Sequence, residues 1–120
     1  MNPLRRDEHT LAAAISAVIP TKNRPEDLRR AVLSVLSQSR LPEQLLIIDQ
    51  SESPESREIV GHLVPEDSAV ALVYVLDTSI SGLVDAKRHS LSIASGDLVC
   101  FLEDDIILEG TYFEEIVKGF

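Results

Sequence analysis

The sequence contains little cysteine, few aromatic residues and no long apolar run. Among its 120 residues there is one cysteine, Cys100, and no tryptophan, and aromatic residues make up 4%. One cysteine excludes an internal disulfide and favours a reducing compartment, so we expect a cytoplasmic protein. A membrane span needs roughly 18 to 20 consecutive apolar residues, and Lys22, Arg24 and Asp49 end the longest apolar candidates. The sequence therefore predicts no transmembrane segment.

Positive charge is also scarce. There are 11 Lys and Arg residues against 20 Asp and Glu residues, a formal net charge of −9. Residues 1–40 carry a net charge of +3 and residues 41–120 carry −12. A negative field repels nucleic-acid phosphates, and so few aromatic side chains offer little surface for base stacking. We expect no nucleic-acid partner, and we expect any phosphate-bearing ligand to be bound locally by basic side chains.

Several common site motifs are absent as well. The sequence has no GxGxxG, no phosphate loop ending in GK[ST] and no GxSxG, which excludes the usual dinucleotide, kinase-like and serine-hydrolase motifs. The three histidines, His9, His62 and His89, lack the spacing of zinc ligands. The chemistry must therefore come from another arrangement of polar residues.

Apolar runs alternate with helical patterns along the chain. Nearly continuous apolar runs predict strands, of which the first is expected to be buried on both faces, over residues 13–19, 45–48, 69–76 and 98–102. A predicted helix follows each run, over residues 25–36, 54–63, 82–94 and 111–118. In the first of them, apolar residues recur at helical spacing, and the second is the weaker pattern. This order predicts an α/β fold with a doubly wound, mostly parallel sheet. We take it as a Rossmann-like half domain with the strand order 3-2-1-4, an order that the alternation of elements does not itself fix. We expect residues 1–12 to form a flexible N-terminal tail and residues 13–120 a single domain.

Particular residues predict where the helices begin and end. Pro25 suits the first position of a helix, and the acidic residues 26–27 favour its positive end. Gly96 predicts the stop after the third helix. Thr111, with Glu114 three residues later, predicts a capping box for the last one.

Polar residues follow three of the predicted strands, at positions 21–24, 49–51 and 103–105. In a doubly wound sheet, ligands bind beyond the carboxyl ends of the strands, where the strand order reverses. With the order 3-2-1-4, this point lies between the first and fourth strands, so we expect the basic residues of 21–24 beside the acids of 103–105. Carboxylates that hold a hard cation next to basic side chains suit a metal-bound diphosphate.

Each of these segments also has a simpler interpretation. The acidic residues 103–105 could form a solvated turn, since runs of charge usually lie on the surface. Lys87 and Arg88, on the helix that opens at Ser81-Gly82, could meet a phosphate or could form an exposed basic face. Composition alone leaves both alternatives open.

Taken in order, six segments of the sequence resemble family 2 glycosyltransferases of the GT-A fold. They are Ile19–Pro25, Ser37–Ser39, Ile47–Ser51, Gly82–Leu83 with Ala86–Arg88, Gly96–Asp97 and Phe101–Asp105. The resemblance implies a domain that binds a nucleotide-diphosphate sugar through Mn²⁺ or Mg²⁺. It implies nucleotide contacts from Pro20, Thr21, Lys22, Asn23, Arg24, Asp49, Gln50, Lys87 and Asp104, and metal contacts from Glu103, Asp104 and Asp105.

The sequence departs from the family pattern at three of these positions. Lys22 stands where the family often has Tyr, so we expect a charge contact in place of base stacking. Gln50 stands where a second acid is common, so an amide would lie near the base. Glu103 replaces the first acid of the metal motif, and its longer side chain would reach the cation through water.

The resemblance also implies a second half that carries the acceptor site and the catalytic base. No residue of these 120 is a candidate for that base, so we expect nucleotide-sugar binding without turnover and leave the acceptor unassigned. A truncated sheet would leave its fourth strand at an edge, which predicts a homo-oligomer. Two alternatives are a structural or regulatory fragment of the same fold and a receiver-like signalling module. A receiver needs acids after its first strand, where this chain has Thr21-Lys22-Asn23-Arg24.

Overall fold

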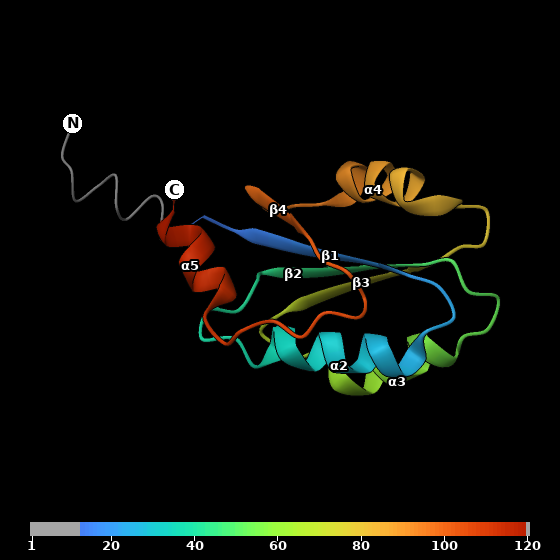
Figure 1. The fold of residues 1–120 in the computed structure, drawn as a ribbon, viewed down its shortest axis with the longest axis horizontal. Coiled ribbons are helices and arrows are strands. Elements are labelled where there is room, and N and C mark those ends of the chain that lie inside the picture. Colours follow the sequence, from blue (N-terminus) through green and yellow to red (C-terminus); the bar gives the residue numbers. More distant parts are fainter. Residues whose placement is uncertain (1–12, 120) are drawn as a thin grey trace.

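The computed structural model describes residues 13–119, which alternate between strands and helices (Figure 1). The predicted tail over residues 1–12 lies outside the described residues. The strands are β1 (Ile15–Thr21), β2 (Gln44–Asp49), β3 (Ala71–Leu76) and β4 (Leu98–Phe101), and the helices are α2 (Pro25–Leu36), α3 (Glu55–Leu63), α4 (Gly82–Ile93) and α5 (Tyr112–Lys118). None of these helices has both the length and the apolar composition that crossing a bilayer requires.

The strands form one parallel sheet in the order β3-β2-β1-β4. The predicted fold class and strand order are therefore confirmed. β1 lies between β2 and β4, and its last residue, Thr21, is in register with Asp49 of β2. Among residues 13–119, β4 pairs only with β1 and so forms one edge of the sheet. This edge is the one on which the predicted self-association depends, and the self-association stays a prediction.

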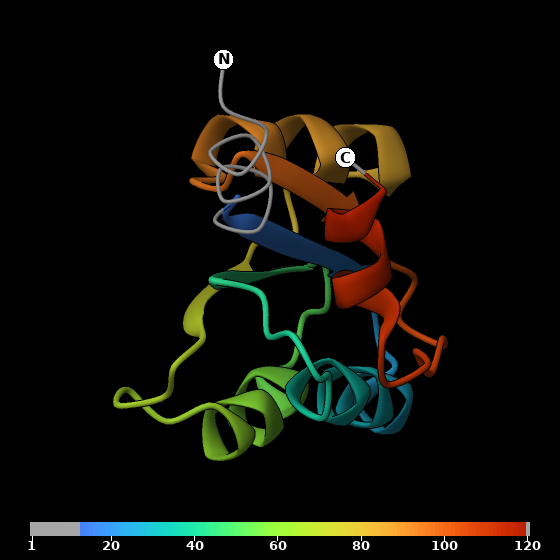
Figure 2. The same cartoon turned by 90° about the vertical axis from the view of Figure 1, so that its left-hand side faces the viewer.

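Helices cover both faces of the sheet. Figures 1 and 2 both show α4 on one face and α2 with α3 on the other. Successive residues of β1 accordingly point to opposite cores, with Ile19 in the core on the α2 side and Val18 in the core on the α4 side. Because neither face meets water, β1 and β2 carry apolar side chains on both faces. α5 adds the fully buried Phe113 to the α2-side core.

The start of α2 follows the sequence prediction. Pro25 occupies the beginning of the helix, and Glu26 and Asp27 lie in its first turn. The helix buries Leu28 and Val32, one turn apart, against the sheet. A proline at this position loses no hydrogen bond, since the first N–H groups of a helix have no partner within it.

Two predictions about helix ends are wrong. Thr111 precedes α5 but its side chain makes no capping hydrogen bond. Glu114 instead accepts a hydrogen bond of 3.3 Å from the Ser39 hydroxyl and pairs with Lys118. The Glu114 carboxylate therefore contacts Ser39, which lies far away in the sequence, and Lys118, one helical turn later. No capping box forms.

Gly96 also has a different role from the one predicted. α4 ends at Ile93 with Ala94 as its cap, and Gly82 is the one described glycine with a positive φ. Gly96 lies so close to β1 that a Cβ atom there would be 2.6 Å from the backbone nitrogen of Ser16. Its N–H donates a hydrogen bond of 2.8 Å to Ser16 Oγ. Glycine is therefore required here by close approach and not by a left-handed turn.

Candidate functional site

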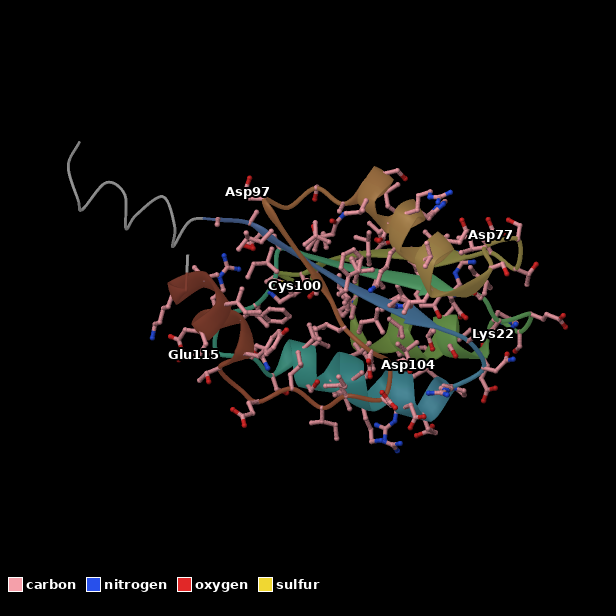
Figure 3. The ribbon with its side chains drawn as sticks, turned by 45° about the horizontal axis from the view of Figure 1, so that its top comes forward. Lys22, Asp77, Asp97, Cys100, Asp104 and Glu115 are labelled. Carbon is pink, nitrogen blue, oxygen red and sulfur yellow. The ribbon has the colours of Figure 1, made fainter. Side chains whose placement is uncertain are left out.

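The candidate site lies where β1, β2 and β4 end. Figure 3 shows Lys22, Asp77 and Asp104, which follow β1, β3 and β4, toward one end of the sheet, and Asp97, which precedes β4, at the other. A pocket of about 400 Å³ opens at this end. It is lined by Pro20, Thr21, Lys22, Asn23, Arg24, Gln50, Gly82, Leu83 and Asp104. Seven of the nine residues predicted to contact the nucleotide therefore line this one pocket.

A second pocket adjoins the first on the side of the acidic turn. It also measures about 400 Å³ and shares four wall residues with the first pocket. Its lining is Pro20, Arg24, Leu83, Leu102, Glu103, Asp104 and Asp105. The two pockets form one depression that has a basic and amide-bearing end and an acidic end, with Arg24 and Asp104 between them.

Asp104 is held in place by the end of β1. The Thr21 hydroxyl donates a hydrogen bond of 2.9 Å to Asp104 Oδ2. Arg24 Nη1 lies 3.4 Å from Asp104 Oδ1 and 4.0 Å from Asp105 Oδ2. The Asp104 side chain is only 12% exposed, whereas that of Asp105 is 52% exposed. One carboxylate is therefore oriented by the protein, and the other remains open to a ligand.

These carboxylates can hold a divalent cation together with a ligand, but the protein alone does not form a cage. Within residues 13–119, no three His, Cys, Asp or Glu side chains form a group that could hold a metal ion. The predicted set of Glu103, Asp104 and Asp105 therefore does not converge on one point. Mg²⁺ is commonly held by one or two carboxylates plus substrate phosphates. Asp104 and Asp105 fit a site of this kind, in which two carboxylates and the phosphates of a ligand share the cation.

Gln50 is fixed by both neighbouring elements. Its backbone N–H donates to the carbonyl oxygen of Thr21 at 2.9 Å, and its side-chain Oε1 accepts from the N–H of Gly82 at 3.0 Å. Gly82 has a φ of 78°, which side-chain-bearing residues rarely adopt. The glycine permits this backbone conformation at the start of α4, from which its N–H reaches Gln50 on the pocket wall.

Asp49, also predicted to lie near the nucleotide, does not line either pocket. It is completely buried. Its Oδ2 accepts a hydrogen bond of 2.6 Å from the Tyr74 hydroxyl, and its Oδ1 accepts one of 2.9 Å from the N–H of Ser51. Burial, followed by the hydrogen bond to Asp49, raises the pKa of the Tyr74 hydroxyl far above its ordinary value of 10.0. Both groups keep their places in the protein and do not face the pocket.

Lys87 is the other predicted nucleotide residue that does not line the pocket. Its Nζ lies 5.2 Å from the centre of the Phe101 ring, at the end of β4. A cation over an aromatic face is attracted by the ring. Lys87 therefore rests against β4, next to the acidic turn that begins two residues later.

Sequence reasoning gave no site role to several residues that shape the site, among them Leu83, Ser51 and Tyr74. Leu83 lines both pockets, and its position directly after a glycine at a helix start was a signal for it. Ser51 shares its segment with Asp49, but its own role was not predicted. Tyr74 lies inside a predicted strand, and only its pairing with Ile47 of β2 brings it near Asp49.

The sequence model described as glycosyl transferase family 2 matches residues 16–120. The chain belongs to this family. The predicted resemblance is confirmed, and membership of glycosyl transferase family 2 replaces the receiver-like alternative. Charge at the end of the first strand had already disfavoured a receiver.

The curated relatives of this family 2 chain share less than a third of the aligned residues with it and are longer proteins. An uncharacterized glycosyltransferase of Haemophilus influenzae is 29% identical over 101 residues, which cover 84% of this chain and 40% of the relative. The GalNAc(5)-diNAcBac-PP-undecaprenol beta-1,3-glucosyltransferase of Campylobacter jejuni is 29% identical over 92 residues, which cover 76% of this chain and 29% of the relative. The chain thus spans well under half the length of either relative.

Solved structures show the same fold. The mannosyltransferase of Pyrobaculum calidifontis, in complex with GDP-Man and Mn²⁺, matches with a TM-score of 0.67 at 18% identity, over 84% of this chain and 33% of that one. Glucosyl-3-phosphoglycerate synthase of Mycobacterium tuberculosis, in complex with Mn²⁺, UDP and phosphoglyceric acid, matches with a TM-score of 0.59 at 21% identity, over 89% and 39%. The family 2 chain therefore has the fold of these transferases.

Proposed function

We propose that this chain is a donor-binding domain that binds a nucleoside-diphosphate sugar, together with Mn²⁺ or Mg²⁺, for transfer of the sugar to an acceptor. The observation that carries the proposal is the depression in which a basic loop and an acidic turn meet. Arg24 lies against both Asp104 and Asp105 at the point that the two pockets share. Two of the solved structures with this fold hold Mn²⁺ with a nucleotide or nucleotide sugar, which supports the same class of ligand here.

Each end of the depression suits a different part of such a ligand. Asp104 and Asp105 would hold the cation at the acidic end. When bound, the metal supplies positive charge that stabilises the departing diphosphate. Lys22 and Arg24 are exposed cations on the pocket wall and would neutralise phosphate oxygens. The nucleoside would extend from there toward Gln50.

Thr21 would act on the ligand through Asp104. Its hydroxyl hydrogen bond takes one lone pair of Asp104 Oδ2 and fixes the orientation of the carboxylate. Asp105, being half exposed and 4.0 Å from Arg24, is free to turn toward a cation. We propose Asp105 as the principal metal ligand, Asp104 as its oriented partner, and Glu103 as a contact through water.

The acceptor and the catalytic base remain outside this proposal. In keeping with that, we expect donor binding without turnover from these 120 residues. A fragment that keeps the fold but has lost its donor site is the competing interpretation. The two differ in one measurable property, since only a working donor site makes nucleotide binding depend on the metal.

Titration calorimetry with UDP, dTDP and GDP, each with and without Mn²⁺, tests the proposal. We expect one nucleotide to bind, its affinity to fall at least about tenfold without Mn²⁺, and Asp105→Ala to cause a similar fall, since a charge-assisted contact is worth roughly 1.5–3 kcal/mol. Asp67→Ala is the matched control, because Asp67 is an exposed carboxylate that pairs with no described residue. If no nucleotide binds, or if both variants behave alike, the chain is not a metal-dependent donor domain.

A further inference from the structure

The basic pocket loop, residues 22–24, has few anchors of its own. Lys22, Asn23 and Arg24 are all exposed, so no burial of their side chains fixes the path of the backbone. Asn23 has a φ of 55°, in the left-handed region that asparagine tolerates better than most residues. Its N–H donates a hydrogen bond of 2.7 Å to Ser51 Oγ. This contact ties the middle of the loop to the segment that follows β2.

The position of Ser51 is set in turn by Asp49. The Ser51 N–H donates to Asp49 Oδ1 at 2.9 Å, the pattern of an Asx turn, in which an aspartate bonds the backbone two residues on. Ser51 is itself buried, with 3% of its surface exposed. The turn therefore has a fixed place for the Ser51 hydroxyl, and the Asp49 carboxylate determines that place.

Asp49 is held by one further group. The Tyr74 hydroxyl donates to Asp49 Oδ2 at 2.6 Å, from a strand that pairs with β2 and not with β1. A buried carboxylate is costly unless hydrogen bonds satisfy it. Tyr74 and Ser51 supply these bonds within the protein, and Asp49 is absent from the walls of both pockets at the site.

We infer that Tyr74 and Asp49 are positioning residues, which act through Ser51 to hold the basic pocket loop in its ligand-binding shape, and that Asp49 does not contact the nucleotide. The series of contacts runs from Tyr74 to Asp49, then to Ser51, and ends at Asn23. The effect on nucleotide binding rests on the proposed function, whereas the effect on the loop does not.

Replacement of Asp49 by Asn separates positioning from direct contact. An asparagine can still accept from the Ser51 N–H through Oδ1. Its amide can donate to the Tyr74 hydroxyl, which then accepts, because a hydroxyl can both donate and accept. Asp49→Asn therefore preserves both links of the series. A carboxylate that read an N–H group of the base would be lost in the same variant.

The experiment measures two properties of the same proteins. Hydrogen exchange of the Asn23 and Ser51 amides is followed by NMR without any ligand, and affinities for UDP, dTDP and GDP with Mn²⁺ are measured by calorimetry. In Tyr74→Phe, we expect exchange at both amides to speed up by about tenfold and affinity to fall by about threefold to tenfold, as the loss of one hydrogen bond implies. In Asp49→Asn, we expect both properties to stay within about threefold of the original protein.

Two further variants control the comparison. Ser51→Ala should speed up exchange at Asn23 while leaving Tyr74 and Asp49 in contact. Tyr112→Phe removes the hydroxyl of the other tyrosine, which bonds no residue in the described part of the chain, and should change neither property. Unchanged exchange at Asn23 in Tyr74→Phe would overturn the inference. Loss of nucleotide binding in Asp49→Asn with normal exchange at Asn23 would also overturn it, by placing Asp49 on the ligand. If the original protein binds no nucleotide, the proposed function fails, and the exchange data still decide the positioning role.

Discussion

Thr21 and Asp104 are 83 residues apart in the sequence, and the hydroxyl of the first donates a hydrogen bond of 2.9 Å to the carboxylate of the second. The contact joins the last residue of β1 to the acidic turn after β4. It exists because β1 and β4 are parallel neighbours, so their carboxyl ends lie at the same end of the sheet. The orientation of Asp104, one of the acids proposed to hold the metal, thus depends on the residue that directly precedes the basic pocket loop.

Replacing Thr21 with Val should weaken this arrangement with little change in side-chain volume. Thr21 is 4% exposed, and loss of its hydrogen bond should lower the free energy of unfolding by about 1 kcal/mol. Affinity for the nucleotide in the presence of Mn²⁺ should fall by several-fold, because Asp104 is no longer oriented. Urea unfolding and calorimetry measure the two effects. Thr21→Ser keeps the hydroxyl, so equal losses of affinity in both variants would contradict the role given to the hydrogen bond.

Replacing Arg24 with Ala should strengthen the binding of Mn²⁺ in the absence of a nucleotide. The guanidinium lies 3.4 Å from Asp104 and 4.0 Å from Asp105, so it competes with a cation for the same carboxylates. The Arg24 side chain is 55% exposed, and an exposed ion pair contributes at most about 1 kcal/mol, so the gain should be about fivefold or less. Electron paramagnetic resonance of free Mn²⁺ measures it.

The control for this prediction is Arg88→Ala, which removes the same charge from an exposed residue of α4 that lines neither pocket. Arg88→Ala should leave Mn²⁺ affinity nearly unchanged. An equal gain in the two variants would show that net charge alone controls the affinity.

The stability that Tyr74 contributes should be lost at high pH. Its pKa in the folded protein is raised above the ordinary value of 10.0, first by burial and then by the hydrogen bond to Asp49. A group whose pKa is raised by folding contributes fully below its unfolded pKa and loses that contribution as the pH rises further. The original protein should therefore be more stable than Tyr74→Phe at pH 7, and the difference should narrow above about pH 10.

Urea unfolding of both proteins between pH 7 and pH 11 measures this difference. Burial also raises the pKa of Cys100 and of Tyr112. Both residues are present in both proteins, so their contributions to the pH dependence of stability cancel in the difference. A difference that stays constant up to pH 11 would contradict the prediction.

Replacing Gly96 with Ala should destabilise the fold, whereas the same change at Gly61 should not. A Cβ at position 96 would lie 2.6 Å from the Ser16 nitrogen and 2.9 Å from the Ala14 oxygen. Both are backbone atoms of the central strand region, so the cost should be about 1–3 kcal/mol, as for overpacking elsewhere. At Gly61, inside α3, a Cβ meets nothing within 4 Å, and alanine should stabilise the helix by about 0.5–1 kcal/mol. Thermal unfolding of the two variants should show a lower melting temperature for Gly96→Ala and a higher one for Gly61→Ala.

The fold could be predicted because its pattern is nearly local. Helices cover both faces of the sheet, so each central strand is predominantly apolar and is easily recognised in the sequence. The ends of the strands then follow from the first polar residues, and the strand order places residues 21–24 beside Asp104. Seven of the residues predicted to contact the nucleotide line the pocket for this reason, and their contact with a nucleotide stays a prediction.

The remaining features depend on contacts that no local pattern shows. Asp49 and Gln50 are adjacent and equally polar, yet one is fully buried and the other lies on the pocket wall. The difference arises from Tyr74 and Gly82, whose approach depends on strand pairing and on a positive φ. Gly96 likewise has a local signature that suits a helix stop, but β1 decides its role.

The pairing of β1 with β4 has a consequence for the order in which the molecule folds. β1, β2 and β3 pair with neighbours close in sequence, whereas β4 joins β1 only after a chain segment of some eighty residues has closed. Closing a long loop costs entropy before its contacts are made, so such pairings tend to form late. We therefore expect the acidic turn to be assembled last, on a surface that the earlier strands have already built. Cations that bind this turn would slow its reopening, and their presence should be visible in the unfolding rate.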